Sequence, residues 1–516
     1  MRKKTTFITT SFLIVMLGIS SIVMAQFSLV GQVRTRTELR DGVGKLATKG
    51  GYVSSLTTQR TRLSFGYLYD NRVNFNVAIQ DVRTWGQDAS TITPADGAKL
   101  GLHEAWAEIT LFNINDTTMK KGFLEKLFFK IGRQELLYDD ARLLGNLDWA
   151  QQGRRHDALL LKALHRGYQI DLGAAFNQNS DAITTGTVYT PGNVPAYVLN
   201  DIGVLVPTPA SFIPTAAGGS ASNVSSAAGT PVLINPAGTN GMNQLYKSLQ
   251  FLYLSKKFGQ TKVSALMLTD YFAKYTSTSV AAGGGLVYGR KFTKGINQRF
   301  TYGAMAVGTI GNASGLKKTW TIAGYAQAGK NKDGKKLEAY HGVVNVMLQK
   351  GKFSFGPGYE YLSGTGPTAV KDGSFDPLYG TPHKFWGYMD YFYVGTGSPK
   401  AGLQDAYLKT KYATKNFFAT LDAHYFGTAQ KTSVGAGNKD LGWELDLLAN
   451  YTLNKFTTLE FGYSNMFANK TQMKAAMAAN YPNAATTYNS TGSWAYLMIS
   501  IKPDFFFAKP VAIKQP

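Results

Sequence analysis

The sequence predicts an all-β protein, a transmembrane antiparallel up-and-down β-barrel of about 18 strands. Three observations lead to this fold class: an N-terminal export signal, many short segments in which apolar and polar residues alternate, and connections that alternate between short and long. A closed barrel leaves no strand edge unpaired, so its backbone hydrogen bonds are all satisfied within lipid.

Residues 1–25 have the features of a secretory signal peptide. Arg2, Lys3 and Lys4 form a basic start, residues 7–23 are mostly apolar, and cleavage is expected after Ala25. No other stretch approaches the roughly 18 apolar residues that a membrane helix needs. We therefore expect an exported chain that crosses the bacterial outer membrane with strands.

Strand-like alternation begins directly after the signal. Between residues 27 and 40, odd positions carry apolar residues such as Leu29 and Val33, whereas even positions carry Arg34 and Arg36. This period of two indicates a strand with one apolar and one polar face. Eighteen segments are expected, at 27–40, 58–69, 73–83, 102–112, 126–136, 154–162, 168–176, 246–258, 261–271, 297–308, 320–329, 338–349, 352–362, 403–413, 416–427, 441–453, 456–467 and 493–501.

The connections between these segments divide into two classes. Most even-numbered connections are short, as at 259–260 and 454–455, and the odd-numbered ones are long, as at 177–245 and 363–402. Short periplasmic turns and long extracellular loops are typical of outer-membrane barrels. The expected organisation is a signal peptide (1–25), a barrel (26–502) and a C-terminal tail (503–516).

The composition limits the possible partners. The net charge is +22, and it falls to +19 when the three basic residues of the signal peptide are removed. Such a charge favours anionic lipid or an anionic solute, and export argues against nucleic acid. The chain has no cysteine, and its six histidines show no metal-ligand spacing. We expect no cofactor and no enzymatic activity.

Arginines dominate the polar face of the first two segments. A charged Arg facing lipid at mid-depth costs about 2–4 kcal/mol, so Arg34, Arg36, Arg60 and Arg62 should point into the lumen. Two interpretations remain open. The arginines form a basic ladder for an anionic solute, or they brace the wall through ion pairs with carboxylates such as Glu38.

The densest charged cluster follows the fifth segment. It contains Gly132-Arg133-Gln134-Glu135-Leu136, then Tyr138-Asp139-Asp140-Ala141-Arg142-Leu143 and Trp149. Together with residues 442–446 and 459–463, this motif resembles the alginate-export family of outer-membrane proteins. The resemblance runs over most of residues 26–502. It implies an 18-stranded monomeric barrel, and the best-known member exports a polyuronate through an arginine-rich pore gated by loops and a periplasmic turn.

Strand parity and this resemblance together define the expected site and function. The candidate pore-lining or solute-binding residues are Arg34, Arg36, Arg60, Arg62, Arg133, Arg142, Glu135 and Asp139. The expected function is a porin-like channel for anionic solutes such as uronic-acid poly- or oligosaccharides, with outer-membrane lipid around a monomer. The alternatives are a general or amino-acid-type porin with structural arginines, and a scaffold or adhesin that acts through loops 177–245 and 363–402.

Overall fold

The structure of the protein is a computed structural model. It describes residues 25–87, 100–116, 118–119, 122–177, 194–216, 230–231, 246–312, 315–394, 399–433, 438–481 and 486–505. All but the last residue of the predicted signal peptide, much of the loop 177–245, and residues 506–516 of the tail lie outside these ranges. No helix among the described residues is long and apolar enough to cross a membrane.

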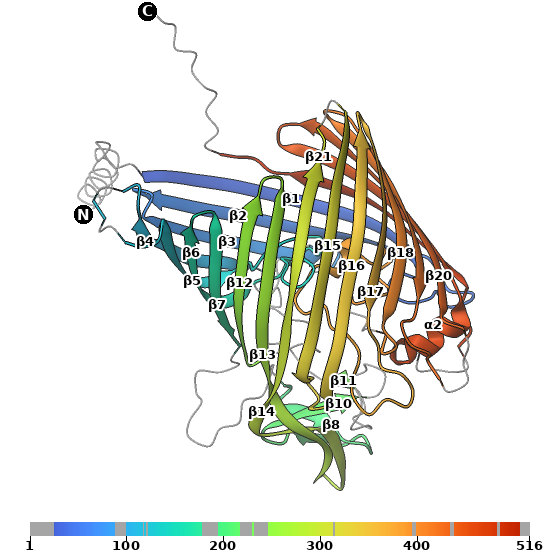
Figure 1. Ribbon diagram of the computed structural model, residues 1–516. Coiled ribbons are helices and arrows are strands. Elements are labelled where there is room, and N and C mark those ends of the chain that lie inside the picture. The colour runs from blue at the N-terminus through green and yellow to red at the C-terminus, as the bar shows by residue number, and fades with distance from the viewer. Residues whose placement is uncertain are drawn as a thin grey trace, which may run out of the picture.

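The described strands form one closed antiparallel barrel of 18 strands (Figure 1). Each strand pairs with the next around the wall, β7 pairs with β12, and β1 pairs with β22 to close the sheet. The barrel strands are β1 (Ala25–Asp41), β2 (Ser54–Tyr69), β3 (Val73–Thr84), β4 (Gly101–Asn113), β5 (Lys126–Gln134), β6 (His156–His165), β7 (Tyr168–Phe176), β12 (Ser248–Phe258), β13 (Thr261–Ala282), β14 (Gly285–Ile310), β15 (Leu316–Lys330), β16 (Lys336–Lys350), β17 (Phe353–Leu362), β18 (Leu403–Ala413), β19 (Phe417–Gly427), β20 (Asp440–Asn454), β21 (Thr457–Ala468) and β22 (Thr491–Ile501). The predicted fold class and strand number are confirmed.

Alternation sets the two faces of the wall. On β1, the side chains of Phe27, Val33 and Leu39 are exposed on the outside, whereas Arg34 and Arg36 are buried. Only the outer face meets lipid, so a strand that slipped by one residue would expose its arginines to the hydrocarbon. This requirement explains why the positions of the strands can be predicted closely from the sequence.

The turns and loops separate to the two ends of the barrel as predicted. The two-residue turn at 259–260 uses Gly259 with a positive φ of 56°, and the chain enters β1 at the same, short-turn end. At that end the backbone after β22 folds back onto β1. The N–H of Gly31 donates to the carbonyl of Pro503, and the N–H of Phe505 donates to Leu29. We call this end periplasmic, following the general architecture of such barrels.

One predicted segment ends at residue 271 and the next begins at 297, which leaves a long loop at 272–296; this expectation was wrong, because these residues form a β-hairpin. β13 and β14 continue past the barrel rim and turn at Gly283-Gly284, whose φ angles are 62° and 81°. Short strands β8 (Tyr197–Leu199), β9 (Leu205–Pro207), β10 (Phe212–Ala216) and β11 (Thr230–Pro231) lie beside it, and β10 pairs with β14. A small core of Val198, Val206, Phe212 and Val287 stabilises this projection. Water surrounds it, so strict alternation is not required there.

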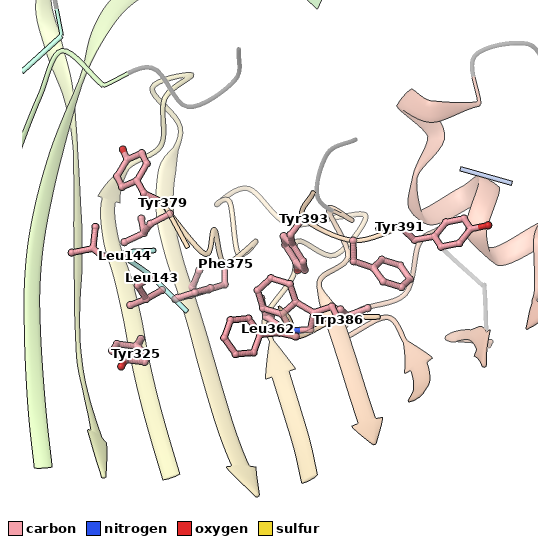
Figure 2. Packing of buried hydrophobic residues seen from close by; sticks show 14 of the residues in the cluster. Leu143, Leu144, Tyr325, Leu362, Phe375, Tyr379, Trp386, Tyr391 and Tyr393 are labelled. Atoms are coloured by element: carbon pink, nitrogen blue, oxygen red, sulfur yellow. The ribbon is translucent and has the colours of Figure 1, made fainter. Parts of the chain in front are cut away.

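Two long connections fold into the barrel. We call residues 135–155 the first inward segment and residues 363–402 the second inward segment. Figure 2 shows Leu143 and Leu144 of the first segment near Phe375 and Tyr379 of the second. The second segment contains η2 (Pro382–Lys384), and the loop after β21 contains α2 (Lys470–Ala476) and η3 (Ala478–Asn480). The core of the molecule is therefore inside the barrel, where loops and wall meet.

Candidate lumenal site

Four arginines form a patch on the inner face of β1 and β2, which we call the arginine arc: Arg34, Arg36, Arg60 and Arg62. Strand register places them together, because Arg34 is opposite Arg60 and Arg62 is opposite Gln32. Arg34, Arg36 and Arg60 are buried, and the side chain of Arg62 is 14% exposed. Like charges on neighbouring strands repel, so this arrangement needs anions or hydrogen-bond acceptors around it.

The first inward segment supplies those acceptors. A carboxylate oxygen of Asp148 lies 2.8 Å from Nη1 of Arg60, and Asp148 lies 3.4 Å from Arg34 and 3.9 Å from Arg62. Arg36 donates to the carbonyl of Trp149 over 2.9 Å, and its guanidinium lies 4.2 Å from the centre of the Trp149 ring. The arginine arc therefore holds a loop carboxylate and three loop carbonyls, those of Trp149, Ala150 and Gln151.

Asp148 is an ionised ligand of this arc. Partial burial alone would raise its pKa, but the hydrogen bond from Arg60 and the charges of Arg60, Arg34 and Arg62 lower the pKa below its ordinary value. The side chain nevertheless remains 41% exposed. One carboxylate that reaches both the solvent and three arginines is in a position to exchange with an anion from solution.

The remaining motif residues fix the first inward segment at other points of the wall. Arg142 pairs with Glu360 on β17 and with Asp140, and its guanidinium lies 3.8 Å from the centre of the Phe385 ring. Asp139 accepts hydrogen bonds from Tyr253 (2.7 Å), Ser264 (2.8 Å) and Lys262 (3.0 Å) on β12 and β13. The segment thus crosses from the arginine arc to two distant parts of the wall.

Glu135 lies where this segment leaves β5. It contacts His103 over 3.1 Å and accepts a hydrogen bond from Asn146 over 2.9 Å. In the part of the chain that the structure describes, His103, Glu104 and Glu135 are the one group whose potential metal-ligand atoms all lie within 4.8 Å of one another. Arg62 contributes a positive potential at both glutamates, which opposes a bound cation.

Arg133 requires a correction. It is next to Gln134, which is fully buried, and it shares a strand face with Ile131, whose side chain is 46% exposed on the outer wall. Arg133 forms a two-bonded pair with Asp157, its register partner on β6, over 2.8 Å for each bond. Strand parity thus places Arg133 on the outer face at the rim, where a paired charge meets water and headgroups. It does not belong with the lumenal arginines.

Carboxylates line a second part of the inner wall, which we call the acidic arc: Asp405, Asp422, Glu444, Asp446 and Glu460 on β18 to β21. All but Glu460 are buried. The second inward segment lies against this arc, because the N–H groups of Met389 and Tyr388 donate to Glu444 (2.7 Å) and Asp446 (3.3 Å). Gly387 allows this approach, since a Cβ there would collide with the Glu444 carboxylate.

The two inward segments meet beside β22. The ring of His383 stacks on Trp149 with centroids 4.3 Å apart and planes 7° apart, and Trp494 and Tyr496 contact Trp149 edge-on. His383 also contacts Asp390 over 2.6 Å. Backbone bonds join the segments further along, from Gly145 to Tyr379 and from Tyr379 to Leu143. Sequence reasoning missed this junction, because residues far apart in the chain form it.

Comparisons with known proteins bear directly on this region. Residues 25–176 match the alginate export family. This alginate-export segment spans β1 to β7 and contains every residue of the predicted site. The family resemblance inferred from the motif is therefore confirmed over these residues. No curated protein matches the chain.

Solved structures share the fold of the whole barrel at low identity. OccD3 (OpdP) of Pseudomonas aeruginosa is 9% identical with a TM-score of 0.54, covering 94% of this chain and 93% of that one. OccAB1 of Acinetobacter baumannii is 12% identical with a TM-score of 0.53, covering 93% and 97%. OpdK of P. aeruginosa, crystallised with vanillate, is 9% identical with a TM-score of 0.51, covering 93% and 99%. The family match and the shared fold agree on an outer-membrane barrel of the porin type.

Proposed function

We propose that this barrel is a channel for anionic solutes, with uronic-acid oligosaccharides or polysaccharides as the substrate class. The observation that carries the proposal is the arginine arc, in which three guanidinium groups share the partly exposed carboxylate of Asp148. The match to the alginate export family supports the same substrate class. The vanillate bound by OpdK is a carboxylate too.

The mechanism follows from an exchange of carboxylates. Asp148 already occupies the position that a solute carboxylate would take, and guanidinium groups bind carboxylates through planar pairs of hydrogen bonds. A uronate that enters the arc replaces Asp148 and is released when Asp148 returns. Several neighbouring arginines allow stepwise transfer, because conduction needs sites that bind without trapping the ion.

A second candidate function is a general or amino-acid-type porin whose arginines only hold the loop in place. The burial of Arg34 and Arg60 under residues 148–151 favours this alternative. The two candidates differ in what happens at Arg62, the least buried of the four arginines, and at Arg36, whose ion-pair partner is Glu38 and not Asp148. In a general porin, the loss of these two charges leaves ion selectivity unchanged.

The test is the reversal potential of single channels in a planar bilayer under a KCl gradient. The variant Arg36→Gln/Arg62→Gln removes two lumenal charges, and Arg72→Gln/Arg133→Gln is its matched control. Arg72 pairs with Asp116 at a periplasmic turn and Arg133 pairs with Asp157 on the outer face. We expect anion selectivity in the parent and the control, and its marked loss in the lumenal variant.

Block by an oligogalacturonate completes this test. Selective block of the parent that weakens in the lumenal variant supports anion transport along the arginine arc. A parent channel that does not prefer anions, or a lumenal variant that matches its control, would overturn the proposal in favour of the general porin. A barrel that never conducts would favour the scaffold, with its activity in the extracellular loops.

A further inference from the structure

A second basic surface lies inside the barrel at its periplasmic end, and neither the family motif nor the arginine pattern includes it. We call it the lysine arc: Lys126, Lys130, Lys162, Lys257, Lys262 and Lys317. Each residue lies within five positions of the periplasmic end of its strand, on β5, β6, β12, β13 or β15. The lysine arc is a part of the wall that the arginine arc on β1 and β2 does not reach.

Contacts with the first inward segment show that these side chains point inward. Lys262 donates to Asp139 of that segment, and Lys257 is its register partner on the same face. Lys162 is the register partner of Asp171, which accepts a hydrogen bond from Tyr138 of the same segment. These interactions fix three members of the arc in the lumen.

The other three members follow from contacts and parity. Lys130 lies 3.6 Å from the ring centre of Trp106 and opposite Glu108. Trp106 and Glu108 share a face of β4 with Glu104. The Glu104 carboxylate accepts a hydrogen bond from the N–H of Glu135 in the first inward segment. Lys126 is four residues before Lys130 on an unbroken strand. Lys317 shares a face with Tyr325, which packs into the inner core. All six therefore face the interior.

The charges of the lysine arc are only partly balanced. Carboxylates lie beside or opposite Lys130, Lys162 and Lys262, but the described residues contain no ion pair to Lys126, Lys257 or Lys317. Lys257 and Lys262 are directly opposite each other, and like charges in that position destabilise a sheet. Lys257 is exposed, and Lys126 and Lys317 are part-exposed. An uncompensated positive field at the periplasmic mouth is the result.

We propose that the lysine arc is an electrostatic collector that captures polyanionic solutes arriving from the periplasm. The inference rests on the proposed function and deepens it, because it assigns a loading side and residues that act before the arginine arc. Charged mouths raise association rates by roughly 10- to 1,000-fold through field focusing. The gain grows with solute charge, so an oligouronate with many carboxylates benefits more than a small monoanion.

The first inward segment connects the two basic surfaces. It places Asp139 on Lys262 of the lysine arc and Asp148 on Arg60 of the arginine arc. A polyanion that replaces these carboxylates in turn passes from one arc to the other along the same segment. The lysine arc thus sets how often a solute enters, whereas the arginine arc sets which ions pass.

The experiment measures how fast an oligogalacturonate of about eight sugars blocks single channels of known orientation. The chain has no cysteine, so a label on Tyr52→Cys in an exposed extracellular loop reports the orientation. The test variant is Lys126→Gln/Lys257→Gln/Lys317→Gln, which breaks no ion pair found among the described residues. The matched control is Lys45→Gln/Lys49→Gln/Lys335→Gln, three exposed lysines at the extracellular end.

We expect faster block from the periplasmic side than from the extracellular side in the parent, with the difference growing as ionic strength falls. The lysine-arc variant should lose about tenfold in the periplasmic blocking rate at low salt, and the control should keep it. Equal rates from both sides of the parent, or an unchanged rate in the lysine-arc variant, would overturn the collector alone. If the oligogalacturonate blocks from neither side and the channel is not anion-selective, the proposed function fails with it.

Discussion

The two inward segments are held to the wall by different combinations of ion pairs and apolar packing. The first segment is anchored by charged groups, with Asp148 on the arginine arc and Arg142 on Glu360. The second segment also has an ion pair to the wall, between Asp376 and Arg299 over 2.6 Å, but in addition it packs a set of buried aromatic side chains, since Trp386, Tyr391 and Phe392 are at most 1% exposed. Ion pairs can be exchanged for a charged solute, whereas buried aromatic packing has no competitor in solution. The comparison indicates a fixed second segment that supports an exchangeable first one.

The largest effect is expected from Arg142→Ala, which tests the charged anchoring of the first segment. Arg142 belongs to that segment and also contacts Phe385 of the second one. The change leaves Glu360, which is 1% exposed, with only His341 beside it, and the loss of one partner of a buried ion pair costs about 3–5 kcal/mol. Urea unfolding in lipid vesicles measures the change. The control is Arg133→Ala, which removes an outer-face pair and should cost at most about 1 kcal/mol. Equal losses in the two variants would contradict the anchoring role.

Met389→Ala tests the apolar half of the comparison. The side chain of Met389 is fully buried, while its N–H bond to Glu444 survives the change. We expect a loss of about 2–5 kcal/mol in the free energy of unfolding, and this loss should not depend on ionic strength. A loss that shrinks at high salt would mean that charge, and not packing, holds the second segment.

Asp148→Asn tests the exchangeable anchor. Loss of a charged hydrogen bond should cost about 1.5–3 kcal/mol, and single-channel anion conductance should rise because the arginines lose their internal competitor. Asp157→Asn, on the outer face beside Arg133, is the matched control and should leave conductance unchanged. If conductance falls in Asp148→Asn, the carboxylate is part of the path and not a competitor.

The smallest expected effect is a dependence on pH. The pKa of Asp148 lies below the ordinary value of about 3.9. Its anchor is therefore fully present above that ordinary value and is lost as the pH falls through the lowered pKa. Anion conductance measured from pH 7 downward should stay level and rise only below about pH 4, and Asp148→Asn should lack this rise. A transition near neutral pH would point to another group.

The sequence predicts the barrel well because lipid imposes alternation on every strand. It predicts the inward segments poorly because their partners are distant in the chain. Asp148 meets Arg60, 88 residues away, and no local pattern specifies this contact. Arg133 is a different case. It lies on the same strand face as Ile131, which places it outside, but its position in the family motif led to the prediction that it lines the pore. The lysine arc was readable from strand parity, but its members are spread over five strands.

The seam between β1 and β22 has a kinetic consequence. Gln32 donates to Ser500 across 468 residues, and the backbone at Pro503 and Phe505 adds two more bonds to β1. Contacts of such high sequence separation form slowly, because the chain loses loop entropy before any bond rewards it. One edge of β1 therefore stays unpaired until β22 is in place. Until then, the unpaired edge of β1 is open to pairing with other chains and is therefore a site for aggregation.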